Sequence, residues 1–394
     1  MSDTTYRLLF VVRAYYPAVR YGGPVATFHR ICSMLASAGH DVSVVCSDMA
    51  SPGYRGQSVP SGRFLVDGVR VHYLRTPIRF HWEGVSLGAM RALHRSVAQS
   101  DAVLISGTRH YLGIITSFLC RRLKKPFLIY PEGSVPPRYR NIGPKMLLDL
   151  VETRRSVRAA NGIVVASLDE CNEVQQWSGV SPDKLILLHA GADPAVETAL
   201  TRDHLRSKWG VPLNTPVLLW VGRIHPEKGL PLLFRALEDR RLERAHLILA
   251  GDAEDKHHIR LLRDWADGAA LAGRVHFVGW VGQSEKAELI KLSDLFILPS
   301  RKESFGLAAG EAVAAGLPAV VTEGCGIASV LREGAGLVAA YDSESLADTI
   351  VQPLADEVLL KRLRLETTDA ARRLDWTFTL NRLEAAYEEI LKSR

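Results

Sequence analysis

Cysteine is scarce in this chain, with five in 394 residues, and no two of them stand at a short, paired spacing. Zinc motifs and disulfide frameworks both need such pairs, so the pattern argues against either. Isolated cysteines are typical of small buried side chains in a reducing compartment. The sequence therefore predicts a cytoplasmic protein with five structural cysteines, Cys32, Cys46, Cys120, Cys171 and Cys325.

Long hydrophobic runs are absent as well. No stretch approaches the ~18 apolar residues that mark a membrane-spanning helix. The apolar run Leu8–Val12 is too short for the core of a signal peptide, and Arg13 follows it directly. We therefore expect neither a signal peptide nor a membrane-spanning helix.

A complete dinucleotide fingerprint is also missing. Gly324 and Gly326 resemble its first two glycines, but Ser329 stands where the third would be. The third glycine permits close packing of helix and strand around a bound dinucleotide, so an NAD site is not expected.

What is present describes an ordinary globular protein long enough for two domains, with 47% hydrophobic and 23% charged residues. The net charge of +6 and the pI of about 9.1 could suit nucleic acid or an anionic membrane surface. Lys and Arg are spread along the chain, however, and no nucleic-acid motif accompanies them. We expect no nucleic-acid partner.

The segment Ser293–Thr322 organises the rest of the chain. Leu295–Leu298 is a short apolar run typical of a strand buried on both faces, and Pro299 ends it. Gly306–Ala315 then predicts a helix with Ser304 as a candidate N-cap, and Ala319–Thr322 predicts the next strand. Ligands of parallel sheets bind where the strands end, so we expect a site in the loop before this helix.

Two acids accompany that loop, Glu303 in it and Glu311 within the helix. The partial positive charge of a helix start suits a diphosphate. An acid on each side, up to ~12 Å apart along a helix, could reach the hydroxyls of two sugar rings. A nucleotide sugar has this shape, although two solvated glutamates would also explain the pattern.

A second loop points to the same ligand. The predicted strand Val217–Val221 leads into a loop that carries Arg223 and Lys228 and ends at Gly229. Arg can bind a diphosphate as a fork and Lys as a point charge. This Gly-Arg-x4-Lys-Gly loop, the Val278-Gly279 turn and the Glu303–Glu311 segment with the Gly-Leu-Pro after it together resemble a family-4-type retaining glycosyltransferase (glycosyl transferases group 1).

The resemblance covers nearly the whole chain and implies the GT-B fold. This is an α/β fold with two Rossmann-like, doubly wound parallel-sheet domains facing a cleft. The implied domains are an acceptor-side domain over residues 1–195 and a nucleotide-sugar domain over 196–375. Residues 376–394 are expected to form a tail helix that packs back on the first domain.

The resemblance also implies roles for these residues. Glu303 would orient the donor sugar and stabilise positive charge on it, Glu311 would hold the ribose, and Arg223 and Lys228 would neutralise the departing diphosphate. The chain has no Asp-x-Asp motif to hold a metal, so we expect a retaining hexosyltransferase without metal or cofactor. The expected donor contacts are Gly22, Gly23, Gly279, Val281, Ser304, Phe305, Gly306, Leu307 and Glu311.

Two residues of the first domain are candidates for the acceptor side, His110 and Glu132. Many relatives carry a histidine directly at the end of the strand that is expected over Ala102–Ile105. Ser106 stands there in this chain, and His110 follows four positions later. His110 therefore has two interpretations, a loop residue that reaches the site or a structural histidine.

The resemblance predicts a nucleotide-sugar donor, with UDP- and GDP-sugars both open. It also predicts a glycan or lipid-linked glycan acceptor in the synthesis of polysaccharide or glycoconjugate at the cell surface. Two other functions fit the same residues, a nucleotide-sugar epimerase of similar fold and a non-catalytic nucleotide-sugar binder. The sequence carries no signal of an oligomeric state.

Two clusters of positive charge bear on the acceptor. They can form a solvated basic face, or they can attach the protein peripherally to an anionic membrane that carries a lipid-linked acceptor. The clusters are Arg121, Arg122, Lys124 and Lys125, then Arg138, Arg140, Lys145, Arg154, Arg155 and Arg158 around a helix with the apolar residues Leu147, Leu150, Val151 and Val157.

Overall fold

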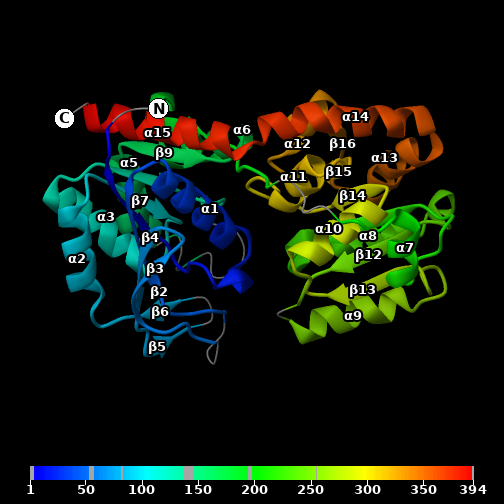
Figure 1. Cartoon of the computed structure of the whole chain (residues 1–394), viewed down its shortest axis with the longest axis horizontal. Coiled ribbons are helices and arrows are strands. Elements are labelled where there is room, and N and C mark those ends of the chain that lie inside the picture. Colours follow the sequence, from blue (N-terminus) through cyan, green and yellow to red (C-terminus); the bar gives the residue numbers. More distant parts are fainter. Residues whose placement is uncertain are drawn as a thin grey trace. The chain divides into compact units, whose positions relative to one another are not determined.

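The computed structural model describes residues 4–52, 57–80, 83–136, 143, 146, 148–193, 198–253 and 255–392 (Figure 1). The chain divides into two compact units. The first contains Met1–His189 together with Thr377–Arg394, and the second contains Ala190–Trp376.

The first unit is built on an eight-stranded sheet with the order β10-β9-β8-β7-β1-β2-β4-β3. Its neighbouring strands are parallel except for β3, which runs antiparallel to β4 at one edge. The strands are β1 Arg7–Val11, β2 Asp41–Ser47, β3 Gly62–Val66, β4 Val69–Leu74, β7 Ala102–Ser106, β8 Phe127–Tyr130, β9 Gly162–Val165 and β10 Leu185–Leu187, with a separate pair β5 Ile78–Arg79 and β6 Gly84–Val85.

Helices cover both faces of this sheet because its strands alternate their side chains between two cores. Leu9 and Val11 belong to a core shared with α2 and α3, whereas Phe10 meets Phe28 of α1 edge to face. The helical segments are η1 Val19–Tyr21, α1 Gly23–Ser37, α2 Ala89–Gln99, α3 Tyr111–Leu123, η2 Asp149–Thr153, α5 Arg154–Ala159, α6 Leu168–Ser178 and η3 Pro182–Lys184.

The last helix, α15 (Trp376–Lys392), belongs to the first unit from Thr377 onward. Glu384 contacts His40 after α1, with 3.2 Å between Oε1 and Nε2. The side chain of Tyr387 is buried. The end of the chain therefore completes the unit that its beginning starts.

The second unit is a six-stranded, wholly parallel sheet with the order β13-β12-β11-β14-β15-β16. Its strands are β11 Val217–Val221, β12 His246–Ala250, β13 Val275–Gly279, β14 Leu295–Leu298, β15 Ala319–Thr322 and β16 Gly336–Ala339. Its helical segments are α7 Arg202–Lys208, η4 Pro226–Lys228, α8 Leu230–Leu237, η5 Arg240–Leu242, α9 Lys256–Ala266, α10 Gln283–Leu292, α11 Leu307–Ala314, α12 Ala328–Val330, η6 Leu331–Ala335, α13 Ser343–Ala355 and α14 Glu357–Arg373.

Each sheet has one place where the strand order reverses. In the first unit it lies between β1 and β7, and in the second between β11 and β14. The loops that leave two such strands diverge to opposite faces of the sheet, so ligands of open α/β sheets bind between them at the carboxyl ends. The fold alone therefore marks the loops after β11 and β14 as a candidate site.

Part of the segment 47–63, which is rich in Ser, Gly and Pro, has regular structure. β3 begins at Gly62, and Met49 bridges Ser58. The sequence pattern misses β3 because it is an edge strand with exposed side chains, among them Leu65, so it shows no buried face.

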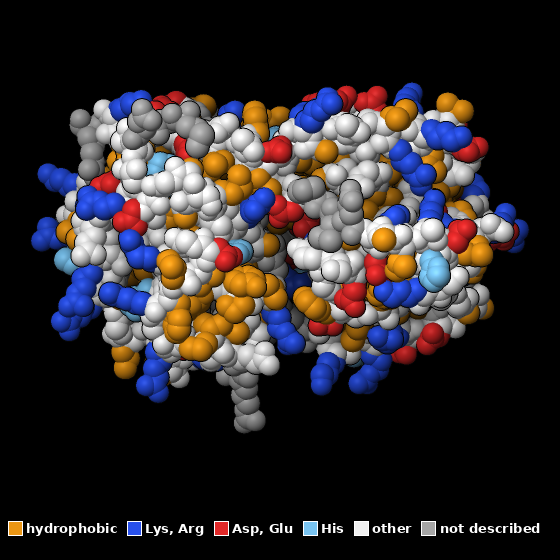
Figure 2. All heavy atoms as spheres, in the orientation of Figure 1, with side chains coloured by type: hydrophobic (Ala, Val, Ile, Leu, Met, Phe, Trp, Pro, Cys, Tyr) orange, Lys and Arg blue, Asp and Glu red, His pale blue; other side chains and the backbone are white. Residues whose placement is uncertain are grey.

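Lys and Arg side chains are spread over the drawn face of both units and mixed with Asp and Glu (Figure 2). Within the expected clusters, Arg121 pairs with Glu152 at 2.6 Å and Arg158 donates to the Ser178 carbonyl at 2.7 Å. Four residues of the second cluster lie outside the described residues: Arg138, Arg140, Lys145 and Leu147. In the part of the chain that the structure describes, no helix is long and apolar enough to cross a membrane.

Candidate active site

The two loops at the strand reversal of the second unit bring an acid and a base together. Lys228 ends η4 in the loop after β11, and its ammonium forms an ion pair with the carboxylate of Glu303 after β14. Ser300 Oγ donates to the same oxygen, Oε1 of Glu303, at 3.1 Å. Two residues that stand 75 positions apart in the sequence thus form one polar centre at the carboxyl edge of the sheet.

Backbone hydrogen bonds fix these loops to one another. The Arg301 N–H donates to the Glu227 carbonyl at 3.0 Å, and the Glu303 N–H donates to the Gly324 carbonyl at 3.0 Å. The Glu303 carbonyl in turn accepts from the Gly326 N–H at 3.1 Å. The loop after β15 therefore holds the backbone of Glu303 through both its N–H and its carbonyl, and the loop after β11 holds Arg301 two positions earlier.

Gly229 shows how closely the first two loops approach. Its φ of 69° lies in the left-handed region, and a Cβ on it would stand 1.8 Å from the Pro299 carbonyl oxygen. Only glycine tolerates both conditions. The glycine at the end of the Gly-Arg-x4-Lys-Gly loop is thus needed for Lys228 to lie beside Glu303.

The helix after Glu303 begins later than expected. α11 starts at Leu307, and its N-cap is Gly306 in the left-handed conformation with φ 107°, without a side-chain cap. The prediction of Ser304 as N-cap is therefore wrong, because the turn is closed by a glycine conformation that a residue-type preference for serine does not reveal. Phe305 is buried, so a donor contact from this residue would come from its backbone.

Glu311 lies in α11 and faces α10. Its Oε1 is 2.8 Å from Nζ of Lys286, and both side chains are largely buried. Gly279 ends β13 with φ 75°, and the space that its Cβ would occupy is open. Val281 follows in the turn before α10. Sequence analysis missed Lys286, because only the packing of α10 beside α11 connects it to Glu311.

Arg223 follows β11 by two positions, in the same loop as Lys228. The loop is held to the turn after β12 as well, because the Ile224 N–H donates to the Asp252 carbonyl at 2.9 Å. No group of three or more His, Cys, Asp or Glu side chains among the described residues is arranged to hold a metal ion.

In the first unit, Gly22 and Gly23 lie at the start of α1, beside its own strand reversal. Gly22 is the N-cap with φ 85°, and Pro24 occupies the first turn. The Gly22 N–H donates to the Val19 carbonyl at 2.9 Å. The left-handed backbone explains the need for glycine at position 22.

His110 caps α3 rather than extending from its loop. Its Nδ1 accepts from the Gly113 N–H at 3.3 Å, and its side chain is 1% exposed. Burial lowers the pKa of His110 to about 3, with Arg13 adding to the effect. His110 is therefore a neutral, enclosed imidazole, which matches the structural interpretation.

Glu132 lies two positions after β8 and has an unusual backbone conformation. It adopts φ 55°, which costs energy for a residue with a Cβ. Its Oε1 accepts a hydrogen bond from Ser106 Oγ at the end of β7. Burial raises the pKa of Glu132 to about 7, although Ser106 and Arg13 oppose the increase. Ser106 stands where many relatives are expected to carry a histidine. It thus contacts a carboxyl group whose pKa is near 7.

Comparison with known families agrees with this geometry. Residues 201–373 match the family described as "Glycosyl transferases group 1", and residues 22–191 match the "Glycosyl transferase 4-like domain". The two matches cover most of the chain between them. The protein is therefore a glycosyltransferase, with the group 1 family in residues 201–373 and the 4-like domain in residues 22–191.

Individual relatives agree with the family. The chain is 27% identical to the D-inositol 3-phosphate glycosyltransferase of Xylanimonas cellulosilytica, over 98% of this chain and 92% of that protein. It is structurally similar to HepE of Anabaena in complex with UDP-glucose, with a TM-score of 0.77, 17% identity and coverage of 99% and 100% of the two chains. Sucrose-phosphate synthase of Thermosynechococcus elongatus is also similar, with a TM-score of 0.75, 16% identity and coverage of 98% and 100%. These neighbours have the GT-B fold, and so does this chain.

Proposed function

We propose that this glycosyltransferase moves a hexose from a nucleotide-sugar donor to an acceptor hydroxyl with retention of configuration and without a metal. The observation that carries the proposal is the Lys228–Glu303 pair at the strand reversal of the second unit. HepE of Anabaena was solved with UDP-glucose, which supports a UDP-sugar as the first donor to test, with GDP-sugars as the alternative.

The chemistry requires stabilisation of the nucleoside diphosphate as its bond to the sugar breaks. Arg223, Lys228 and the N-terminus of α11 would supply positive charge to the phosphates. Glu303 would orient the sugar hydroxyls and stabilise the positive charge that develops on the ring. Glu311, held by Lys286, would bind the ribose.

The acceptor is proposed to be a glycan or a lipid-linked glycan in the synthesis of cell-surface polysaccharide or glycoconjugate. The relative in Xylanimonas is named for an inositol phosphate, so a small phosphorylated polyol is the second candidate. An acceptor panel must contain both classes.

Nucleotide release provides the primary test. The enzyme is incubated with UDP- or GDP-hexoses and the acceptor panel, with and without EDTA, and NMR reads the anomeric configuration of the product. We expect Lys228→Ala and Glu303→Ala each to lower turnover by about 10²–10³-fold, the effect of removing one group that stabilises charge in a transition state.

Lys361→Ala is the matched control, because Lys361 is exposed and forms its ion pair with the exposed Glu357. Near-wild-type turnover of either site variant on the true acceptor would contradict the assignment. Loss of activity in EDTA would contradict metal independence, and an inverted product would contradict retention.

The two rival functions give different results in the same assay. An epimerase would convert the donor to its epimer with no acceptor present. A non-catalytic binder would bind the donor and release no nucleotide with any acceptor.

A peripheral position on an anionic membrane is proposed as well, on the inner face. Two apolar residues beside the second basic cluster support it, because Leu150 is 74% and Val151 is 65% exposed. Arg155 next to them is exposed too. Apolar side chains flanked by cations are typical of surfaces that insert into the boundary of a charged bilayer.

A further inference from the structure

A cavity of about 550 Å³ opens in the second unit, lined by residues that precede its strands. Residues 213–216 lead into β11, Ala245 leads into β12 and Asp294 leads into β14. The strands are parallel, so this cavity lies at the edge of the sheet opposite to Lys228 and Glu303. Five residues of strand separate the two edges by about 16 Å. The cavity is therefore distinct from the proposed donor site.

Positive charge dominates the lining. Five arginines face two acids there, namely Arg202, Arg206, Arg240, Arg241 and Arg244 against Glu243 and Asp294. Asp294 alone serves three guanidinium groups, those of Arg202, Arg206 and Arg364. One carboxylate cannot balance three cations, so excess positive charge remains around Asp294, whereas Arg241 is balanced by its ion pairs with Asp239 and Asp348.

Part of this charge has a structural task. Arg206 is 5% exposed, and it donates to the carbonyls of Leu213, Thr215 and Leu292 as well as to Asp294. Burial lowers the pKa of Arg206, and the neighbouring Arg202 lowers it further. Arg206 thus holds the loop before β11 through its hydrogen bonds to the Leu213 and Thr215 carbonyls, and it does so beside a second cation, Arg202.

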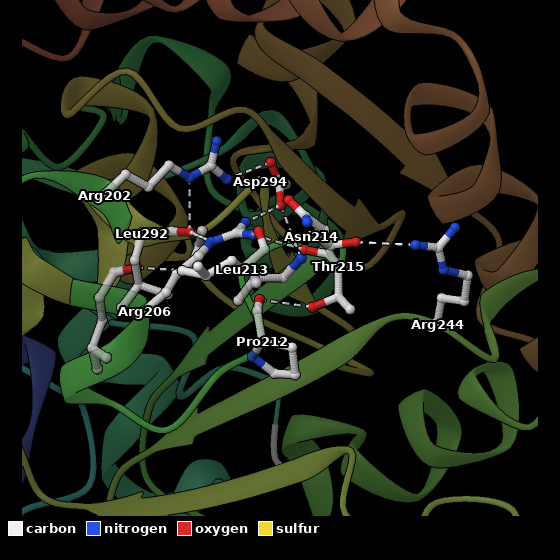
Figure 3. A network of polar contacts seen from close by, with 12 residues as sticks. Arg202, Arg206, Pro212, Leu213, Asn214, Thr215, Arg244, Leu292 and Asp294 are labelled. Carbon is white, nitrogen blue, oxygen red and sulfur yellow. Dashed lines mark hydrogen bonds and ion pairs between the residues drawn. The ribbon is translucent and has the colours of Figure 1, made fainter. Parts of the chain in front are cut away.

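Other guanidinium groups retain donors for a ligand. Among the described residues, the guanidinium of Arg244 has one hydrogen bond, at 3.1 Å to the Asn214 carbonyl. The guanidinium of Arg240 has no hydrogen bond or ion pair to any residue within the described ranges. Figure 3 shows Arg202 and Arg206 approaching Asp294 from one side of the 212–215 loop, and Arg244 approaching Asn214 from the other. Cations thus flank the loop on two sides.

Apolar side chains form another part of the lining, beside the polar Asn214 and Thr215, and they are Leu213, Leu242, Val351, Leu354 and Leu360. A volume of this size falls in the range of about 300–1,000 Å³ that is typical of small-molecule sites. Arginine forks suit the oxygens of phosphate, and the apolar wall suits a ring or a carbon chain.

We propose that this cavity binds a small molecule that carries a phosphate or diphosphate group and an apolar portion. Arg240 and Arg244 bind the phosphate oxygens at the rim, with Arg202 on the other side of the loop. The site is separate from the donor site and would be occupied independently of it.

Calorimetric titration tests the proposal with two simple ligands, inorganic pyrophosphate for the charge and phenyl phosphate for the charge and the apolar wall together. We expect the double variant Arg240→Gln/Arg244→Gln to weaken the binding of both at least about tenfold, as the loss of charge-assisted hydrogen bonds implies. Both side chains are exposed, so the variant should fold, and its unfolding midpoint without ligand verifies this.

Two controls separate this site from the proposed donor site. Arg260→Gln removes an exposed arginine of α9 outside the cavity, and Lys228→Ala disables the donor site. We expect the Arg260→Gln and Lys228→Ala variants each to bind the two ligands in the cavity with the affinity of the wild type. The proposal is overturned if neither ligand binds, if the double variant binds as wild type does, or if Lys228→Ala alone abolishes all binding.

Discussion

At the scale of single residues, Glu132 combines three features: a left-handed backbone, a hydrogen bond from Ser106 and a pKa raised to about 7. A strained backbone and a shifted pKa are typical of functional positions. Their coincidence at the end of β8 supports an acceptor-side role more strongly than the sequence did.

The raised pKa predicts how Glu132 affects stability. An acid whose pKa is higher in the folded state stabilises the fold below its ordinary pKa of 4.5 and loses this contribution as the pH rises through about 7. Relative to Glu132→Gln, the wild type should therefore lose at most about 3 kcal/mol of unfolding free energy between pH 4.5 and pH 8. Urea unfolding of both proteins at pH 4.5 and pH 8 measures this change. If the two proteins differ in unfolding free energy by the same amount at both pH values, the raised pKa of Glu132 is contradicted.

Lys286 is the second residue whose role is open to test. Its ion pair with Glu311 should hold that carboxylate for the ribose of the donor. We expect Lys286→Met to raise the KM for the donor about tenfold with little change in kcat, because the contact is made before and during the reaction alike. Lys256→Met on α9 is the control, and a fall in kcat at constant KM would refute the positioning role.

The residues proposed for the donor side could be named from the sequence, and their partners could not. Arg223, Lys228 and Glu303 lie in loops that follow apolar strands, and strand ends are where such sheets bind ligands. The Lys228–Glu303 and Lys286–Glu311 pairs depend on the order of strands and the packing of helices. Neither leaves a local signal in the sequence.

At the scale of elements, the close approach of two loops predicts the effect of a single methyl group. Gly229→Ala should cost both the left-handed backbone, about 1–2 kcal/mol, and the clash with the Pro299 carbonyl. Gly210→Ala is a matched control, because Gly210 has the same φ of 69° with nothing within 4 Å of its Cβ position. Chemical denaturation should show the larger loss for Gly229→Ala, and equal losses would contradict the contact.

Buried strands were the elements best predicted from sequence. β11, β14 and β15 have the expected bounds, because continuous apolar runs are required where a parallel sheet is covered on both faces. The start of α11 was missed because its cap is a backbone conformation of Gly306 and not a side-chain hydrogen bond.

At the scale of the whole molecule, the proposed membrane contact can be tested with vesicles. The double variant Leu150→Glu/Val151→Glu should greatly reduce co-sedimentation with anionic vesicles at low salt, because it replaces apolar contact with repulsion. Val358→Glu/Leu365→Glu is the control, since these residues of α14 are similarly exposed, at 78% and 76%. Absence of binding by the wild type would remove the membrane proposal.

The path of the chain has a consequence for its synthesis. α15 supplies buried residues, including Leu383 and Tyr387, to the unit that begins with β1. A ribosome makes the entire second unit before it makes this helix, so the first unit remains incompletely packed while residues 190–376 are synthesised. Cutting the gene after His189 should accordingly yield a fragment that exposes an apolar groove and depends on chaperones.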